Sequence, residues 1–319
     1  MSEPGMPDGV GLLFPGQGSQ FVGMGRDLAE AFPLARQRFE EADEALGFSL
    51  SRLCWEGPDD ELTLTRNAQP ALLVHSVVAW DLLCAEQEPP VALAAGHSLG
   101  EFSAYVVAGS LSFADAVRTV RRRGELMFAS GQARPGTMMA VLGLDDAAVE
   151  QACAAASVEG SVVVPANYNA PGQLVISGDR DAVARAAELL KAAGAKRVLP
   201  LNVSGAFHSP LMQVAEAGLR EHLAGVELHA PRFPVVSNVT AEPVTDAETA
   251  RRLLVEQLTS PVRWVASVQR MAGSGASRFL ELGPGNVLSG LARRIVKDAP
   301  ARALGTAEQL STFLAESAV

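Results

Sequence analysis

The sequence predicts an α/β fold in which a larger, parallel-sheet part is interrupted by a small α+β subdomain. Short apolar runs of strand length alternate with helical patterns towards both ends of the chain, which is typical of a parallel sheet with helices on both faces. The middle of the chain instead follows the order strand-helix-strand-strand-helix-strand. The length of 319 residues is enough for two such parts, each with its own core.

The part before the insertion contains two strands that end in glycine-rich loops. Residues 10–14 form an apolar run that stops at Pro15-Gly16-Gln17-Gly18-Ser19-Gln20, because glycine and proline adopt backbone angles that strands reject. Residues 91–95 form a second run, which leads into Gly96-His97-Ser98-Leu99-Gly100. The helical patterns around these strands lie at residues 33–46, 70–86, 101–108 and 113–130.

The middle segment, which we assign to residues 133–202, has the element order of a ferredoxin-like unit, a small sheet with two helices on one face. Asp145 and Asp179 are expected to be helix N-caps, and Gly178 and Gly194 flank the second helix. The expected elements are a strand at 137–142, a helix at 145–156, strands at 162–167 and 173–177, a helix at 179–193 and a strand at 197–201.

After the insertion the alternating pattern returns, so residues 1–132 and 203–319 together form the larger subdomain. Pro261 is expected to interrupt a helical stretch, since proline cannot continue a helix. The expected elements are a helix at 211–223, a strand at 234–237, one or two helices within 247–272, a strand at 278–282, and a final helix, strand and helix.

Composition and charge exclude several classes of protein. With 48% hydrophobic and 19% charged residues, the chain is neither disordered nor a coiled coil. The net charge of −10 disfavours binding to nucleic acid or to an anionic membrane. Residues 1–10 show no secretory signal, and the most apolar stretch, 71–85, is interrupted and too short to span a bilayer. We therefore expect a soluble, cytoplasmic protein.

The three cysteines, Cys54, Cys84 and Cys153, lie far apart in the sequence. Their spacing fits neither a zinc site nor a disulfide framework, which indicates a reducing compartment and no metal.

The segment Gly96-His97-Ser98-Leu99-Gly100 fits the pattern G-x-S-x-G between a strand and a helix. In that setting the glycines permit a tight, strained turn that lifts the serine hydroxyl above the edge of a hydrolase-like sheet. The N–H of Leu99 would lie at a helix N-terminus and would stabilise an oxyanion. Ser98 is therefore the candidate nucleophile, and the alternative is a capping serine on a glycine-rich turn.

A serine hydroxyl needs a base to attack an ester or thioester at neutral pH, and the chain has five histidines. His97 is next to the nucleophile, so its side chain should point away, and His75 lies in an apolar helix typical of a core. His208 follows a strand and precedes a helix, where α/β active sites are built, and is the candidate base. The two remaining histidines are expected on solvated faces, His222 and His229.

The group that orients His208 stays open on the residues alone. Hydrolase triads use an acid, and the segment Glu256-Gln257-Leu258 offers alternatives. A backbone carbonyl or amide would do the same with less strength.

Six motifs occur along the chain: Leu13-Phe14-Pro15-Gly16-Gln17-Gly18-Ser19-Gln20, Gly96-His97-Ser98-Leu99-Gly100-Glu101, Asn167-Tyr168-Asn169-Ala170-Pro171-Gly172-Gln173, Ala206-Phe207-His208-Ser209, Gln257 with Pro261-Val262-Arg263-Trp264, and Glu281-Leu282-Gly283-Pro284-Gly285. In this order they resemble the malonyl-CoA:acyl carrier protein transacylases, over residues 11–295. One motif alone is weak, but six in register are specific.

The resemblance implies a ping-pong acyl transfer without a further cofactor. Ser98 would attack the malonyl thioester of coenzyme A, and the phosphopantetheine thiol of an acyl carrier protein would then take the malonyl group. His208 would act as general base and then as acid, oriented by the backbone carbonyl of a glutamine near Gln257. Gln17 and the N–H of Leu99 would form the oxyanion hole.

The free carboxylate of a malonyl group requires a cation, and a guanidinium binds a carboxylate through two parallel hydrogen bonds. The resemblance places this cation in Arg121-Arg122-Arg123, and alignment through Phe113-Ala114-Asp115-Ala116 puts it at Arg123. Helix geometry allows at most one of the three arginines to reach a pocket. The alternative is that all three lie on a solvated helix end.

Phe207 bears on the choice of acyl group. In related acyltransferases Ala-Phe-His-Ser goes with malonyl, since a bulky ring leaves little room for a branch at the α-carbon. Gly205 stands where modular polyketide enzymes have histidine, which resembles the free-standing enzymes.

Two other functions would share some of these residues. A Ser–His acyl hydrolase, such as a proofreading thioesterase of a polyketide pathway, would share Ser98 and His208 but would have no use for a buried Arg123. A non-catalytic docking module for a carrier protein would need none of Ser98, His208, Gln17 and Arg123. The pathway, fatty-acid or polyketide synthesis, stays open.

Docking of an acidic carrier protein on this acidic chain requires a local basic patch. The candidates are Lys196-Arg197 and Arg293-Arg294 with Lys297, each of which is otherwise an ordinary solvated face. We expect the protein to be a monomer.

Overall fold

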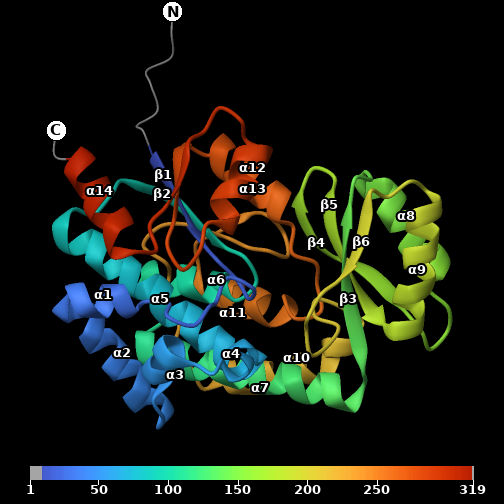
Figure 1. The fold of residues 1–319 in the computed structure, drawn as a ribbon, viewed down its shortest axis with the longest axis horizontal. Helices are drawn as coiled ribbons and strands as arrows, with labels where there is room; N and C mark the ends of the chain where they lie inside the picture. Colours follow the sequence, from blue (N-terminus) through green and yellow to red (C-terminus); the bar gives the residue numbers. More distant parts are fainter. Residues whose placement is uncertain (1–8, 318–319) are drawn as a thin grey trace, which may run out of the picture.

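A computed structural model describes residues 9–317 and contains two sheets (Figure 1). The larger sheet has six strands in the order β10-β9-β1-β2-β7-β8, and the smaller has four in the order β4-β5-β3-β6. In Figure 1 the smaller sheet and its two helices lie at one end of the molecule. The expectation of no secretory signal rests on residues 1–10, of which residues 1–8 lie outside the described residues.

β1 (Gly9–Phe14) lies at the centre of the larger sheet, between β2 (Val91–Gly96) and β9 (Ala276–Glu281). These pairs are parallel, as predicted, and β7 (Val235–Val236) and β10 (Ala301–Ala303) extend the parallel sheet. The carboxyl ends of β1, β2 and β7 therefore meet at one edge of the sheet.

One edge strand departs from the parallel prediction. β8 (Pro243–Val244) pairs antiparallel with β7. The sequence prediction missed it because two residues are too few for a hydrophobic pattern.

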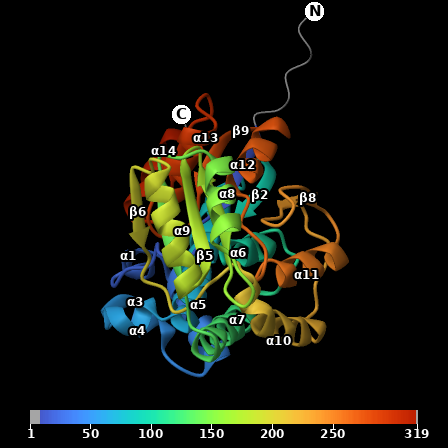
Figure 2. The same cartoon turned by 90° about the vertical axis from the view of Figure 1, so that its right-hand side faces the viewer.

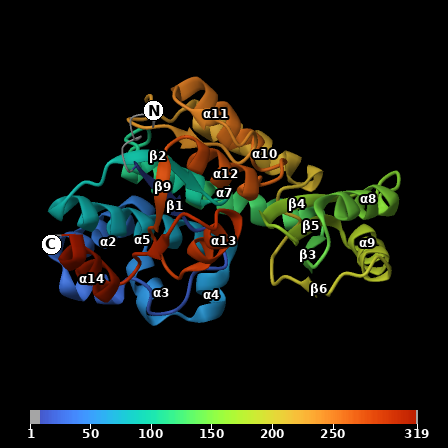
Figure 3. The ribbon, with the colours of Figure 1, turned by 90° about the horizontal axis from the view of Figure 1, so that it is seen from above.

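Helices cover both faces of the larger sheet, as Figure 3 shows from above. Val10, Leu12 and Phe14 of β1 pack in the core with α5, α6 and α7, whereas Leu13 packs on the opposite face with α12 and α13. This alternation follows from the two-residue period of a strand. The helices of this subdomain are α1 (Arg26–Ala31), α2 (Pro33–Leu46), α3 (Leu50–Glu56), α4 (Asp59–Thr63), α5 (Thr65–Glu86), α6 (Gly100–Val107), α7 (Phe113–Ala133), the 3₁₀ turn η1 (Pro210–Met212), α10 (Gln213–Ala224), α11 (Ala247–Glu256), α12 (Trp264–Gly273), α13 (Val287–Ile295) and α14 (Ala307–Ser317).

α5 begins at Thr65 rather than at Pro70, which lies inside the helix. Pro70 has no N–H to donate to the carbonyl of Arg66, and that carbonyl accepts a hydrogen bond from Arg121 instead (3.4 Å). At 22 residues α5 is long and apolar enough to cross a membrane, contrary to the expectation from sequence, but 83% of its apolar window is buried inside the protein. It is the central helix of the core.

Three helices of the N-terminal part were not predicted, α1, α3 and α4. They have six, seven and five residues, which is too short to show a helical repeat of apolar positions.

The smaller sheet has the predicted ferredoxin-like order, with antiparallel pairs throughout. Figure 2 shows α8 and α9 side by side against it. The boundaries proposed at 132/133 and 202/203 stay predictions, and α7 runs across the first of them. The elements are β3 (Gly136–Leu142), α8 (Asp146–Ala156), β4 (Val163–Ala170), β5 (Gln173–Asp179), α9 (Arg180–Ala192) and β6 (Arg197–Pro200).

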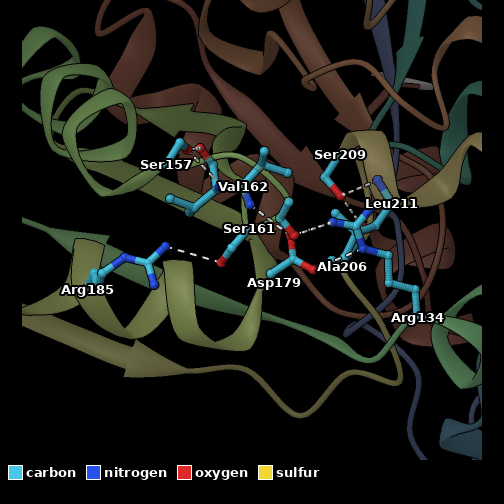
Figure 4. Close-up of polar contacts among 11 residues, drawn as sticks. Arg134, Ser157, Ser161, Val162, Asp179, Arg185, Ala206, Ser209 and Leu211 are labelled. Carbon is cyan, nitrogen blue, oxygen red and sulfur yellow. Dashed lines mark hydrogen bonds and ion pairs between the residues drawn. The ribbon is translucent and has the colours of Figure 1, made fainter.

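The two predicted N-caps behave differently. Asp145 caps α8 by accepting from the N–H of Ala148 (2.8 Å). Asp179 stands at the N-cap position of α9, but its carboxylate makes no cap bond. It accepts from Arg134 (3.0 and 2.8 Å) and from the N–H of Val162 (2.8 Å), as Figure 4 shows. The predicted N-cap position of Asp179 is therefore confirmed, but its side chain does not cap the helix, because its oxygens bind the Arg134 guanidinium and the N–H of Val162 instead.

Candidate active site

Ser98 lies on a sharp turn directly after β2. Its φ of 52° is in the left-handed region, which a residue with a side chain adopts at a cost of about 1–3 kcal/mol. A Cβ on Gly96 would lie 1.8 Å from the carbonyl carbon of Gly100, and a Cβ on Gly100 would lie 2.0 Å from the carbonyl oxygen of Phe14. Both glycines of the motif are therefore required for the turn to close.

His208 is placed against Ser98. Its Nε2 lies 2.8 Å from Ser98 Oγ, and its Nδ1 lies 2.9 Å from the backbone carbonyl of Gln257. A carbonyl only accepts, so Nδ1 carries the hydrogen and Nε2 is free to accept the serine proton. Burial, together with the charge of Arg123, lowers the pKa of His208 to about 3, so the imidazole is neutral at neutral pH.

The residues alone left the group that orients His208 open, whereas the resemblance implied a backbone carbonyl near Gln257, and the structure has the carbonyl of Gln257 in contact with the histidine. The side chain of Glu256 instead pairs with Arg252 (3.0 and 3.1 Å). An acid from this segment therefore does not contact the histidine.

One of the three consecutive arginines enters the site. Arg123 is fully buried, and its Nη2 donates to Ser98 Oγ (3.1 Å) and to Gln257 Oε1 (2.8 Å). Its Nε has no acceptor among residues 9–317. Burial lowers the pKa of Arg123 to about 10, so the group stays cationic at neutral pH. Arg121 instead pairs with Glu125, and the side chain of Arg122 is half exposed.

Gln17 lies in the loop after β1, and Leu99 follows Ser98 in the turn after β2. Both residues line the same cavity as Ser98. The side-chain amide of Gln17 donates to Thr65 Oγ1 (3.2 Å). Within the described part of the chain, the backbone N–H groups of Gln17 and Leu99 make no hydrogen bond. Two backbone donors are thus available beside the serine.

These groups share a cavity of about 420 Å³ between the two subdomains. The smaller sheet contributes Met138 and Val175 to its wall, and the larger subdomain contributes Phe207, which is 6% exposed. His97 also lines this cavity, but its Nε2 lies 2.8 Å from Asn169 Oδ1 and it makes no hydrogen bond to Ser98. The cavity is therefore lined by apolar side chains together with a serine, a neutral imidazole and a guanidinium.

The other histidines lie away from the site. His75 is buried in α5, with Nε2 2.8 Å from the carbonyl of Gly305, and burial lowers its pKa to about 4, which confirms the prediction of a core residue. The side chain of His229 is 64% exposed, also as predicted. His222 is half-buried, and its Nε2 lies 3.1 Å from Thr119 Oγ1, so the prediction of a solvated face holds only in part.

Two polar residues of the site were missed by sequence reasoning. Asn238 accepts from the N–H of Ser98 (2.7 Å) and donates to the carbonyl of Gly96 (2.8 Å), so it holds both sides of the turn. Glu101 is fully buried and accepts from Gln257 Nε2 (2.7 Å); burial raises its pKa to about 7. A polar residue after β7, at the same sheet edge as the nucleophile, was the available signal for Asn238.

The described residues 9–317 hold no group of three or more His, Cys, Asp or Glu side chains arranged to bind a metal ion. The three cysteines are free thiols, and burial raises the pKa of each to about 12.

The fold is that of an acyltransferase, and its cavity holds a hydrogen-bonded Ser98–His208 pair. The acyl transferase domain family matches residues 12–312, and the chain belongs to this family. It is 48% identical over 286 residues to a malonyl CoA-acyl carrier protein transacylase of Bacillus subtilis, which covers 90% of each chain.

Solved structures of such enzymes share the fold. A malonyl-CoA:acyl carrier protein transacylase of Xanthomonas oryzae superposes with a TM-score of 0.94 at 45% identity, over 98% of this chain and 99% of the other. A malonyl-transacylase solved in complex with its type II PKS acyl-carrier protein superposes with a TM-score of 0.92 at 44% identity, over 97% and 99% of the two chains. These matches confirm the resemblance inferred from the six motifs.

Proposed function

We propose that the protein transfers a malonyl group from malonyl-CoA to the phosphopantetheine thiol of an acyl carrier protein, in two half-reactions joined by a malonyl ester on Ser98. The observation that carries this proposal is the fully buried Arg123, whose Nη2 lies 3.1 Å from Ser98 Oγ. A buried guanidinium is costly unless it meets an anion, and the malonyl carboxylate is that anion.

In the first half-reaction Ser98 Oγ attacks the thioester carbonyl, and its proton moves to His208 Nε2. The N–H groups of Gln17 and Leu99 donate to the oxyanion of the tetrahedral intermediate. When the intermediate collapses, the carbon–sulfur bond breaks and His208 returns the proton to the coenzyme A thiolate. The products are the malonyl ester and free coenzyme A.

In the second half-reaction the carrier protein's thiol gives its proton to His208 and attacks the ester carbonyl. The bond from the carbonyl carbon to Ser98 Oγ breaks, and the serine regains the proton. The carbonyl of Gln257, 2.9 Å from His208 Nδ1, stabilises the transient imidazolium in both steps.

Phe207 supports malonyl over a branched donor. The ring is buried and lines the cavity wall, so an α-methyl group would crowd it at a cost of about 1–3 kcal/mol.

The family and the buried Arg123 both disfavour the alternative, a Ser–His hydrolase acting on neutral acyl chains. The arrangement of nucleophile, base and cation likewise disfavours a non-catalytic docking module.

The proposal needs no cofactor besides the thioester substrate and the carrier's phosphopantetheine. We further propose that the protein acts in the cytoplasm as a monomer.

Intact-mass analysis of the protein mixed with malonyl-CoA, methylmalonyl-CoA or acetyl-CoA tests this proposal. We expect one stable malonyl adduct that disappears when holo carrier protein is added, and a weaker signal with the other two donors. Unmodified protein after exposure to malonyl-CoA, or an adduct that water removes as fast as the carrier protein does, would contradict it.

A basic patch at the subdomain junction fits the acidic carrier protein. Lys196 and Arg294 line a shallow hollow of about 600 Å³, and Arg294 bridges the subdomains by donating to the carbonyl of Pro171 (3.2 Å). Arg197 and Lys297 are exposed nearby in the sequence. Arg293 donates to the carbonyl of Ala301 (2.6 Å) and does not line this hollow, so the charge reversal below uses Arg294.

Charge reversal in this patch, Lys196→Glu with Arg294→Glu, is expected to raise the KM for the carrier protein about tenfold, or ~1.4 kcal/mol, through lost attraction. Malonyl loading of Ser98 from malonyl-CoA should not change. The matched control is Lys191→Glu with Arg220→Glu, which changes the net charge equally on exposed helices. Equal rates towards the carrier protein in both double variants would refute the patch.

A further inference from the structure

A buried ionisable side chain, Glu101, lies beside the site and has no role in the steps above. Glu101 lies in the first turn of α6 and is fully buried. Its Oε2 accepts from Gln257 Nε2 (2.7 Å) and from the N–H of Asn238 (3.2 Å). Its Oε1 is buried without a partner among residues 9–317. Burying a carboxyl group costs free energy, so an apolar side chain would pack here at lower cost. This cost indicates that Glu101 has a role other than packing.

The side-chain amide of Gln257 connects Glu101 to Arg123. Its Nε2 donates to Glu101 and to the carbonyl of Ser98 (3.0 Å), while its Oε1 accepts from Arg123 Nη2 (2.8 Å). A reversed amide would set N–H groups against the guanidinium and an oxygen against the carboxylate. The carboxylate of Glu101 therefore permits only one orientation of this amide.

The two halves of Gln257 serve different partners. Its backbone carbonyl contacts His208, whereas its side chain contacts Arg123. A substitution that removes only the Gln257 side chain should therefore change the position of the Arg123 guanidinium more than it changes proton transfer by His208.

We propose that Glu101 is a positioning residue for donor selection, which acts through the Gln257 amide to keep the Arg123 guanidinium beside Ser98, where the malonyl carboxylate is bound. This inference rests on the role proposed above for Arg123. Glu101 does not contact the substrate in this scheme. Its effect is expected on the recognition of a charged donor and not on the acylation chemistry shared by all donors.

The chain contains a matched structural carboxylate outside the cavity. Glu281 is also fully buried and accepts from the N–H groups of Leu288 (3.0 Å) and Ser289 (2.7 Å). Replacing it removes the same kind of group from the same kind of environment without touching Gln257 or Arg123.

Single-turnover acylation with malonyl-CoA and with acetyl-CoA tests the inference in three single variants. In Glu101→Leu we expect kcat/KM for malonyl-CoA to fall about 10- to 100-fold, mainly through KM, because a charged hydrogen-bond network loses an acceptor. The rate of acylation by acetyl-CoA should stay within about twofold of the wild-type rate, because the Ser98–His208 pair is intact. Glu101→Gln keeps an oxygen for Gln257 Nε2 and should restore the preference for malonyl. Glu281→Leu should lower the Tm and leave the ratio of the two donors unchanged.

If Glu101→Leu does not fold, the Gln257→Met variant tests the same inference. This variant retains the backbone carbonyl for His208 and removes the amide link, so the same shift in donor preference is expected. In a Glu101→Leu, Gln257→Met double variant the two effects should not add. A wild-type ratio of malonyl to acetyl loading in Gln257→Met or in folded Glu101→Leu overturns the inference. Absence of a malonyl adduct on the wild-type protein overturns the proposed function itself, and the inference with it.

Discussion

Ser98→Ala is expected to abolish the malonyl adduct and to lower malonyl transfer to the carrier protein by about 10⁴-fold or more, since no other group can carry the acyl intermediate. The hydroxyl lies 2.8 Å from His208 Nε2 and 3.1 Å from Arg123 Nη2, so it is the atom at which base and cation meet. Intact mass and the steady-state rate with holo carrier protein measure the two effects.

Ser103→Ala is the matched control. Ser103 is fully buried on the helix that follows the nucleophile, and its hydroxyl makes no hydrogen bond among residues 9–317. This variant should load malonyl like the wild type. His208→Ala should slow loading by about 10²–10⁴-fold, the usual contribution of a general base. A Ser98→Ala protein that still forms the adduct would place the nucleophile elsewhere.

Arg123→Ala is expected to lower kcat/KM for malonyl-CoA by about 10²–10³-fold, corresponding to ~3–4 kcal/mol for the loss of a buried, charge-assisted contact. Loading from acetyl-CoA, which has no free carboxylate, should fall much less, so the ratio of the two donors shifts towards acetyl. The rates of adduct formation with each donor, measured by intact mass, give this ratio directly.

Two variants of the same helix separate charge from geometry. Arg122→Ala removes an arginine whose side chain is 51% exposed, and it should leave both donors unaffected. Arg123→Lys keeps a positive charge without the planar fork, so it should recover part of the malonyl loading. Equal malonyl loading in Arg123→Ala and the wild type would remove the role assigned to this residue.

Local sequence patterns predicted the glycine turn that carries Ser98. The turn is recognised from its two glycines between a strand and a helix. Both glycines are needed because the backbone at Gly96 and Gly100 approaches other backbone atoms too closely for a side chain. The βαββαβ order likewise predicted the smaller sheet, since each of its elements is long enough to show its own period.

Features that depend on distant partners were not predicted. The carboxylate of Asp179 binds Arg134, which is 45 positions away in the sequence, instead of capping its helix. A local rule for N-caps does not include such a distant partner. The short helices before Thr65 and the edge strand β8 are stabilised by packing and carry too few residues for a pattern of their own.

The sequence by itself determined the kinds of group at the site and their order along the chain: a serine on a glycine turn, a histidine on a loop and a cluster of three arginines. The family resemblance named Arg123 and a backbone carbonyl near Gln257, but only the tertiary structure shows that this arginine contacts Ser98 and that this carbonyl contacts His208. The reason is physical: the rotation of a helix selects the inward arginine, and the bonds from Ser98 to His208 and from Arg123 to Gln257 join residues 110 and 134 positions apart, which meet only when the sheet and its helices have packed.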